Sequence, residues 1–426
     1  MPATAPRYLT RFQCLTERCE DTCCAGLVVP VSQARWRILQ DAVAGGPDAS
    51  RVQSFVLPDP GSGAGAEAAY IAKREDGHCT FLDERKLCSL HQKYGEAVLP
   101  DACAMFPRVP TRRAERLEVT GSFGCPEVVR LALLAEDALE QVPVDASLAG
   151  RPEQARELGA EDAWSRNADR VRSVALHLLE RREYPFASRL FMLGELARRL
   201  GTFYFRGTEA FREEGAQALL TATLSDFASE KSLTELHQQL DSISLPGGPW
   251  AAICGAVLKS RLGAAGSTRF HTWARGVLDS YGGADASPDD VWALHAQRRS
   301  KLESTLGPRV EQYFRHYAVN HWLRVPFTDA PSLMDYVFKL ALRAAVLRWT
   351  LSGHPTVAAL CEQEQAPGLD GAGDAQARLD AAAVECFQLS AKHLEQSPEL
   401  HSLAHGLSGG AGVDALPRML VLLNGL

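Results

Sequence analysis

Cysteine is the residue type whose positions in this sequence say most about chemistry. Eight of the eleven cysteines fall within the first 125 residues. In a chain of this length, such clustering favours metal or redox chemistry over a disulfide framework. Thiolates select zinc or iron–sulfur clusters over harder ions, and the spacing alone leaves both open. We predict metal ligands among Cys14, Cys19, Cys23, Cys24, Cys79, Cys88, Cys103 and Cys125.

Eight thiols exceed the needs of one cubane cluster, which takes at most about four. Three interpretations remain open: a subset binds, two metal centres exist, or some cysteines are structural. Adjacent cysteines such as Cys23 and Cys24 usually point in different directions, so both need not bind the same metal. The remaining cysteines, Cys254, Cys361 and Cys386, lie in apolar helical stretches, where we expect buried packing residues.

Other cofactor motifs are weak. Cys19 and Cys23 begin the spacing of a radical-type cluster motif, but Gly26 stands where the third cysteine would be. The glycine-rich segment 61–65 follows Pro60, and no convincing strand precedes it. It is therefore a poor candidate for the glycine-rich turn of a conventional nucleotide-binding fold.

Composition excludes several classes of protein. The 426 residues are 46% hydrophobic and 23% charged, as in an ordinary globular protein. The formal net charge of −7 argues against a nucleic-acid binder. No apolar run reaches the roughly 18 residues that cross a bilayer, and residues 1–12 lack the apolar region of a secretory signal. We expect a cytoplasmic protein that binds neither nucleic acid nor membrane; the oligomeric state is not predictable.

We expect two domains in the chain, and together they must position the cysteines. Residues 1–135 form the Cys-rich metal-binding domain, in which we expect little β structure, with Ser32 as the N-cap of a helix that ends at Gly45. Residues 136–426 form an α-helical domain, and its acidic beginning, up to about residue 163, is expected to be a connection. We predict a mainly α fold, with the Cys-rich part packed on a C-terminal helical bundle. Apolar residues at three- and four-residue spacing predict helices over 171–179, 190–200, 233–240, 313–322 and 336–351.

Around the cysteines, the sequence resembles the flagellin lysine-N-methylase family, which belongs with a broader group of Cys-rich iron- or zinc-chelating proteins. Two later stretches, Tyr184-Pro185 with Arg189-Leu190 and residues 313–351 with Asn320, resemble the family in pattern. The matching N-terminal residues are Tyr8, Phe12, Cys14, the run from Cys19 to Cys24, Gly26, Cys79, Phe81-Leu82, Leu87-Cys88, Leu90-His91, Cys103, Phe106-Pro107-Arg108 and Cys125-Pro126-Glu127.

The resemblance implies an enzyme that transfers a methyl group from S-adenosylmethionine to lysine side chains of a protein such as flagellin. It also implies an iron–sulfur cluster, and so favours a [4Fe–4S] cluster over zinc for these cysteines. Arg108 is similar to the family arginine that follows Pro107. A guanidinium there would bind the carboxylate of the methionine group. A salt bridge to a neighbouring carboxylate is the alternative.

Lysine methylation requires a neutral amine, because only the free base is a nucleophile. Glu20, Asp21 and Glu127 flank the cysteines, and we predict that these catalytic carboxylates accept the ammonium group or its proton. Two other functions stay open. One is a non-catalytic zinc-binding module that shapes a helical interaction scaffold. The other is a cluster-dependent methyltransferase that acts on a different acceptor, either another protein or a small amine.

Overall fold

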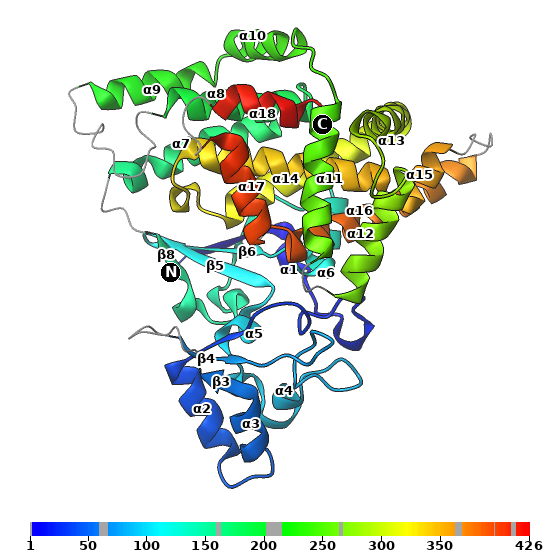
Figure 1. Cartoon of the computed structure of the whole chain (residues 1–426). Coiled ribbons are helices and arrows are strands. Elements are labelled where there is room, and N and C mark those ends of the chain that lie inside the picture. The colour runs from blue at the N-terminus through cyan, green and yellow to red at the C-terminus, as the bar shows by residue number, and fades with distance from the viewer. Residues whose placement is uncertain are drawn as a thin grey trace.

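Helices make up most of the chain in the computed structural model (Figure 1). The structure describes residues 2–58, 67–158, 163–201, 215–263, 267–362, 369–395, 397–409 and 415–426. A large helical body carries a sheet along its lower face, and a smaller lobe lies below this sheet. The predicted mainly α fold is confirmed.

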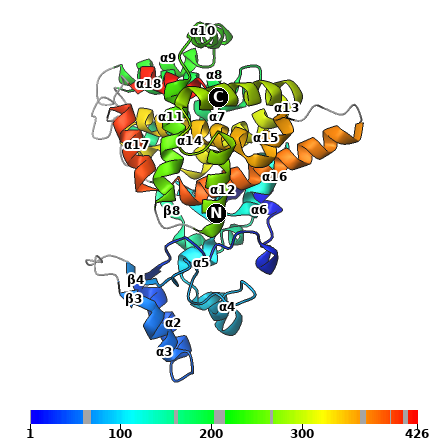
Figure 2. The same ribbon diagram turned by 45° about the vertical axis from the view of Figure 1, so that its right-hand side comes forward.

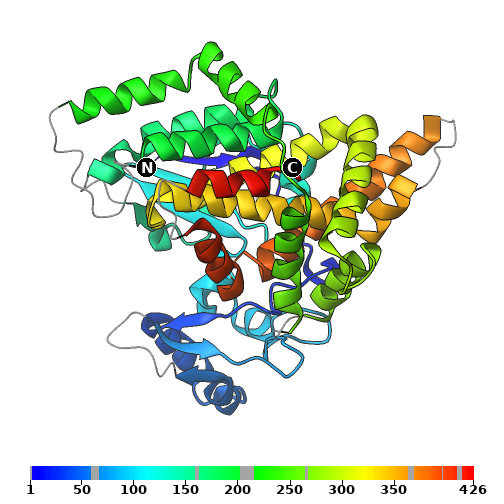
Figure 3. The ribbon, with the colours of Figure 1, turned by 45° about the horizontal axis from the view of Figure 1, so that its top comes forward.

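The helical body is built around α14 (Leu333–Gly353), which crosses its middle (Figure 3). Every side chain of α14 except Lys339 and Arg343 is buried, as expected of a helix that is covered on all sides. The other helices of this body are α7 (Ala163–Glu180), α8 (Phe186–Arg199), α9 (Ala216–Asp226), α10 (Glu230–Asp241), α11 (Gly248–Leu262), α12 (Thr268–Ser280), α13 (Pro288–Arg324), α15 (Pro355–Glu362), α16 (Leu369–His393), α17 (Pro398–Ser408) and α18 (Leu416–Leu423).

The long helix α13 bends before it reaches the sheet. Leu306 leaves the helical conformation (φ −134°, ψ 19°) two residues before Pro308. Proline has no amide hydrogen, and its ring clashes with the preceding turn, which accounts for a bend here. Beyond the bend, every side chain from Tyr313 to Leu323 is buried, and this half contacts α14 and the sheet.

The five-stranded sheet has the order β7-β1-β6-β5-β8. Its central hairpin pairs β5 with β6 in antiparallel fashion, and β1 lies parallel to β6. Helix α6 (Pro126–Leu134) follows β6 and packs against α13 and α16. The strands are β1 (Ala3–Pro6), β5 (Arg108–Arg113), β6 (Arg116–Gly121), β7 (Gln141–Val144) and β8 (Arg156–Leu158), and the short helix α1 (Arg7–Thr10) follows β1.

The smaller lobe has its own apolar core, which includes Val31, Leu39, Ile71 and Phe81. Its sheet has the order β2-β4-β3, and the lobe projects below the helical body in Figure 2. Its elements are α2 (Gln33–Val43), α3 (Ala49–Phe55), α4 (Ser89–Tyr94) and α5 (Asp101–Met105), with strands β2 (Pro30–Ser32), β3 (Val56–Pro58) and β4 (Glu67–Ile71). Short 3-10 turns cover Thr16–Arg18 (η1), Glu96–Val98 (η2), Ala146–Ala149 (η3), Pro152–Gln154 (η4) and Phe327–Asp329 (η6).

The helices were predicted better than the strands. Ser32 caps α2 by accepting a hydrogen bond from the amide of Arg35, as expected. The five predicted helical stretches coincide with α7, α8, α10, α13 and α14, except that Leu200 is the C-cap residue of α8. The expected connection after residue 135 instead contributes β7 and β8, which join strands from the Cys-rich part in one sheet. The glycine-rich segment 61–65 lies outside the described residues. No described helix is both long enough and apolar enough to span a membrane.

A buried network joins the sheet to α13. The Tyr8 hydroxyl donates to Oδ1 of Asn320 (2.7 Å) and accepts from the amide of Gly121 (2.6 Å). Asn320 in turn donates from Nδ2 to the carbonyl of Gly121 (3.2 Å). Tyr8 and Asn320 both belong to the pattern that resembles the family, and here they tie the start of the chain to the helical body.

We predict that Tyr8→Phe lowers the free energy of unfolding by about 1–3 kcal/mol, because it leaves the Asn320 oxygen and the Gly121 amide buried without their partner. Urea-induced unfolding followed by circular dichroism measures the effect. The matched control is Tyr70→Phe, since Tyr70 is exposed and should tolerate the change. Equal unfolding midpoints for the two variants would show that the network contributes no net stability.

Candidate metal site between the two lobes

The eight N-terminal cysteines lie on loops, at helix N-caps and in the short helix α5. All eight are free thiols. Cys19 follows η1, Cys88 is the N-cap residue of α4, Cys103 lies in α5, and Cys125 is the N-cap residue of α6. Such positions place thiols on backbone that is not confined within a long helix or strand.

The backbone brings Cys24, Cys79 and Cys88 together. The amide of Cys79 donates to the carbonyl of Cys24 (2.7 Å). Cys88 forms an isolated bridge with Leu82, whose amide donates to the carbonyl of Cys79 (3.0 Å). Cys79 belongs to the apolar core of the smaller lobe, and Cys24 and Cys88 pack against that core.

Cys103 completes a group of four thiols. Although Cys103 is an exposed residue, protein atoms around its thiol desolvate it, and this effect, with smaller ones from Cys24, Cys88 and Cys79, raises its pKa to about 12. Burial likewise raises the pKa of Cys88, with contributions from Cys24 and Cys79. We call Cys24, Cys79, Cys88 and Cys103 the four-thiol group. A negative charge on one of these thiols makes it harder to deprotonate the others, because thiolates repel one another. A bound cation would offset this repulsion.

Cys14, Cys19 and Cys125 form a second set, which we call the three-thiol group. Burial, with small contributions from Cys19 and Cys14, raises the pKa of Cys125 to about 12. The pKa of Cys19 is also raised, first by burial and then by Glu20 and Cys14. Cys23 is exposed and interacts with the neighbouring Cys24, whose pKa this contact raises. The sequence left open whether a subset of the eight cysteines binds, two centres exist or some cysteines are structural, and none of these interpretations is tested by this grouping.

Neither group is closed around a single ion. In the part of the chain that the structure describes, no three His, Cys, Asp or Glu side chains are arranged to hold a metal ion. Of the other three cysteines, Cys254 and Cys386 are buried in helices, as predicted, and Cys361 is half-buried.

The three predicted carboxylates are all paired with cations or amides. Arg130 contacts both Glu20 (2.5 Å) and Glu127. Asp21 is buried and accepts from Nζ of Lys392 (2.8 Å) and from Nε2 of Gln388 (2.7 Å). Their role as proton or ammonium acceptors stays a prediction, and in this structure that role would require the present partner to be displaced.

Arg108 makes none of the salt bridges that its position suggested, since those carboxylates pair with Arg130 and Lys392. Its guanidinium lies over the ring of Phe12, 5.7 Å from the centroid. Its Nε atom is buried and has no hydrogen-bond partner among the described residues. An unpartnered buried guanidinium nitrogen is costly, and it suits the predicted binding of a carboxylate at Arg108.

Helix α16 supplies residues that sequence reasoning missed. Lys392 has a fully buried side chain and also donates to the carbonyl of Thr22 (3.0 Å). Gln388 donates to the carbonyl of Gly124 (3.2 Å) as well as to Asp21. No sequence signal connects these residues to the cysteines. The sequence could have identified Arg130, because it stands three residues after Glu127, at the spacing of helical ion pairs.

Gly26 sits where the cysteine loop meets the end of α16. Its φ of +75° is a conformation that L side chains rarely adopt. A Cβ atom at this position would lie 3.3 Å from Cε1 of His393. Burial lowers the pKa of His393 to about 4, so this imidazole is neutral at pH 7. The backbone conformation therefore favours glycine here, and the contact with His393 leaves little room for a side chain.

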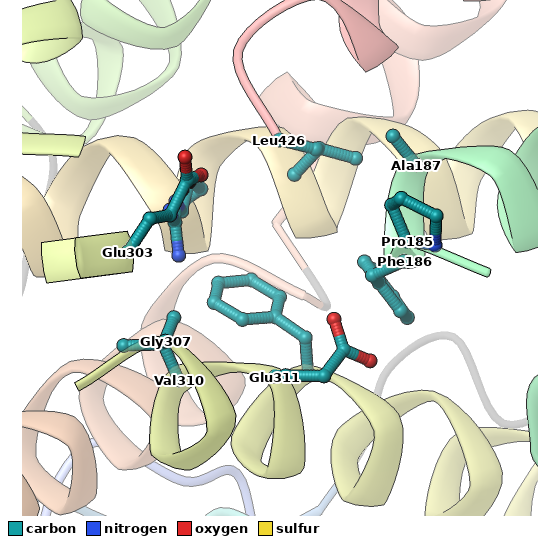
Figure 4. Close-up of a pocket in the computed structure, with 10 residues that line it drawn as sticks. Pro185, Phe186, Ala187, Glu303, Gly307, Val310, Glu311 and Leu426 are labelled. Carbon is teal, nitrogen blue, oxygen red and sulfur yellow. Dashed lines mark hydrogen bonds and ion pairs between the residues drawn. The ribbon is translucent and has the colours of Figure 1, made fainter. Parts of the chain in front are cut away.

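A separate pocket lies within the helical body (Figure 4). Phe186, Phe314, Glu303, Glu311 and Arg348 line it, and they come from α8, α13 and α14. Its charges are already paired, because Arg348 contacts Glu303 at 3.0 Å and Glu311 pairs with Arg189. Arg189 belongs to the later stretch that resembles the family. The pocket has no cysteine in its lining, so it is not part of the candidate metal site.

The comparisons with known proteins identify the family. Residues 172–422, more than half of the chain, match the model of the FliB lysine N-methylase C-terminal domain. The chain therefore belongs to the FliB lysine N-methylase family. The matched residues run from within α7 to within α18 and lie in the helical body, whereas the eight candidate cysteines precede them.

Three curated relatives are similar over a shorter stretch. The lysine-N-methylase of Salmonella typhimurium is 26% identical over 150 residues, which cover 32% of this chain and 33% of the relative. The flagellar biosynthetic protein FliU of Salmonella muenchen is 26% identical over 139 residues, covering 32% of this chain and 79% of the relative. The lysine-N-methylase of Salmonella choleraesuis is 26% identical over 139 residues. The match thus spans about a third of the two lysine-N-methylases. No solved structure matches the chain.

We predict that Lys392→Met lowers the free energy of unfolding by about 3–5 kcal/mol, because it leaves the buried Asp21 carboxylate without a cation. Urea denaturation measures the change. Lys231→Met is the control, since the Lys231 side chain is 86% exposed. The double variant Asp21→Asn with Lys392→Met removes both charges and should recover part of the loss. A Lys392→Met protein as stable as the control would contradict the importance of this ion pair.

Proposed function

We propose that the chain is a protein-lysine N-methyltransferase that transfers a methyl group from S-adenosylmethionine to lysine side chains of a flagellin-like protein. We further propose that a [4Fe–4S] cluster is held by the four-thiol group. The observation that carries the proposal is the backbone contact that brings the segments of Cys24, Cys79 and Cys88 together in a chain of the FliB lysine N-methylase family. The name of the FliU relative supports a flagellar acceptor.

The donor set fits such a cluster. Cubane clusters take up to four Cys thiolates, and the four-thiol group supplies that number. Its thiols repel one another as anions, a repulsion that a cationic metal centre offsets. Cys24 lies in a turn and Cys88 at the N-cap of α4, both packed against the small core, so the ligands can close when the metal binds, as metal sites that form together with their metal do. A cluster held by all four thiols supplies a rigid charged platform and leaves no iron without a thiolate.

The chain's own residues account for binding the methyl donor. Arg108 offers a buried, unpartnered guanidinium nitrogen to the carboxylate of S-adenosylmethionine. Phe12 stacks on the same guanidinium and limits its orientations. Arg108 lies five residues after Cys103, and Phe12 lies two residues before Cys14, so this pair connects segments that carry both groups of thiols.

The transfer itself requires a neutral amine and an aligned donor. The lone pair of the lysine Nζ attacks the methyl carbon, the carbon–sulfur bond breaks, and the sulfonium becomes a neutral thioether. Alignment within about 3–3.5 Å supplies much of the rate acceleration. One proton must leave the nitrogen, and Glu20 and Glu127 are the proposed acceptors because both lie at the partly exposed edge of the site, where one of them would take the proton once Arg130 releases it. Asp21, enclosed by Lys392 and Gln388, is better placed to hold the cysteine loop.

Anaerobic purification followed by iron, zinc and sulfide quantification tests the cluster. We expect about four iron and four sulfide per chain. Cys103→Ala should lose most of both, because it removes one of four ligands, while Cys361→Ala, at a half-buried thiol of the helical body, should keep both. Incubation with S-adenosylmethionine and purified flagellin, read by mass spectrometry, then tests methyl transfer. Stoichiometric zinc without sulfide, and no methylated lysine, would favour the zinc-binding scaffold instead.

A further inference from the structure

The pocket lined by α8, α13 and α14 has no role in the proposed reaction, although these three helices lie within the stretch that matches the family model. Its cavity volume is about 100 Å³. An apolar cavity of about 150 Å³ holds one benzene molecule, so this pocket has room for the end of a side chain but not for the whole of S-adenosylmethionine. A ligand of this pocket is therefore a small group, different from the methyl donor.

Most of the lining of the pocket is apolar. Phe186 and Phe314 are buried, and their ring centroids lie 5.5 Å apart. Pro185, Val310 and Leu426 contribute further apolar surface. Small-molecule sites commonly combine such a lining with a few polar groups that fix the orientation of the ligand. The apolar lining suits an aliphatic chain, and the polar groups determine what this chain must carry at its end.

Two carboxylates in the lining keep hydrogen-bonding capacity for a ligand (Figure 4). Oε1 of Glu303 accepts from Arg348 (3.0 Å), and Oε1 of Glu311 pairs with Arg189. Within the described part of the chain, no residue donates a hydrogen bond to Oε2 of either glutamate. The side chains of Glu303 and Glu311 are 51% and 34% exposed. The second oxygen of each carboxylate can therefore accept from a cationic donor.

Buried arginines hold these carboxylates in place. The Arg189 side chain is fully buried, and that of Arg348 is 5% exposed. Burial lowers the pKa of each guanidinium to about 10, so both stay protonated at pH 7. Each glutamate thus binds a buried cation through one oxygen and keeps the other for the pocket. A carboxylate fixed in this way is already oriented before the ligand arrives, which lowers the cost of binding.

We propose that this pocket binds a lysine side chain of the acceptor protein, with the ammonium group at Glu311 and the aliphatic stem along the apolar lining. Lysine combines such a stem with N–H donors at its end. Glu311 is the better acceptor, because the partly exposed Arg299 already lies 3.7 Å from Oε1 of Glu303, whereas Arg189 beside Glu311 is fully buried. The inference rests on the proposed function and adds an acceptor-recognition site that no cysteine lines.

Methylation of the bound lysine should weaken this interaction. Each methyl group replaces one N–H donor of the ammonium, and a trimethylated lysine has none left. The rings of Phe186 and Phe314 offer little compensation, because the guanidinium groups of Arg189 and Arg348 already lie over them, 5.5 Å and 5.8 Å from the ring centroids. The pocket therefore favours the unmodified acceptor over the methylated product.

The test measures binding of Nα-acetyl-lysine N-methylamide to the full-length protein by ligand-observed NMR. The norleucine analogue, which keeps the stem but lacks the amine, and the Nζ-trimethyl form are the comparison probes. The main variant is Gly307→Leu, because a Cβ at this lining residue meets no atom within 4 Å, so the added side chain can fill the pocket without breaking an ion pair. Its control is Gly406→Leu, at an exposed glycine of α17 where a Cβ also meets no atom within 4 Å.

We expect Gly307→Leu to weaken binding of the lysine probe by about tenfold or more, because it removes a charge-assisted hydrogen bond, and Gly406→Leu to leave it unchanged. Glu311→Gln should weaken binding by a similar factor, and circular dichroism checks its fold because Arg189 loses its carboxylate. The norleucine and trimethyl probes should bind about tenfold more weakly than the lysine probe. With flagellin as acceptor, Gly307→Leu should raise KM more than it lowers kcat.

Equal binding of the lysine and norleucine probes, or equal binding of the lysine probe to the unaltered protein and to Gly307→Leu, would overturn the lysine pocket. Absence of any binding of the lysine probe would do the same. The results also separate the two proposals. A protein that binds the lysine probe at Glu311 but methylates no lysine would refute the proposed activity and keep the pocket, whereas methylation with a KM that Gly307→Leu does not change would do the reverse.

Discussion

The position of the cysteine loop depends on one buried ion pair. Nζ of Lys392 lies 2.8 Å from Oδ1 of Asp21, and both side chains are almost completely buried. Burying two charges is costly unless their remaining hydrogen-bonding capacity is satisfied. That condition holds here, since Gln388 donates to the second oxygen of Asp21 and Lys392 also donates to the carbonyl of Thr22. The pair therefore fixes the loop in one orientation on the end of α16.

The arrangement of the thiols follows from this anchor. With Asp21 fixed, the loop of Cys19 lies against α6, where Arg130 joins Glu20 to Glu127, while Cys24 continues into the smaller lobe, where Cys79 and Cys88 lie. Gly26 lets the chain turn tightly against His393 at this point. The helical body, which carries the family match, thus determines how the cysteines of the N-terminal part are divided. This dependence gives a physical reason why a metal-binding segment and a helical bundle occur in one chain.

Sequence reasoning predicted the helices because their apolar residues recur every three to four positions over long stretches, as in α8 and α14. It missed the sheets because the strands are three to six residues long and proline interrupts several of them. Pro143, for example, falls in the stretch expected to be a connection, yet it lies in β7 at the edge of the sheet, where proline is tolerated. The clustering of cysteines predicted a metal site, but its division into two groups depends on tertiary contacts. Lys392 lies 371 positions from Asp21, and neither residue identifies the other in the sequence.

The most direct test of the central claim, that four particular thiols form one ligand set, is differential alkylation of the iron-loaded protein. Exposed thiols are alkylated under native anaerobic conditions, and the remainder are labelled with a second reagent after unfolding and iron chelation. The account predicts that Cys103 is protected in the iron-loaded protein together with Cys24, Cys79 and Cys88, and that it reacts once iron is removed, because its side chain is exposed. Alkylation of Cys103 in the iron-loaded protein as fast as that of the exposed Cys23 would contradict the account.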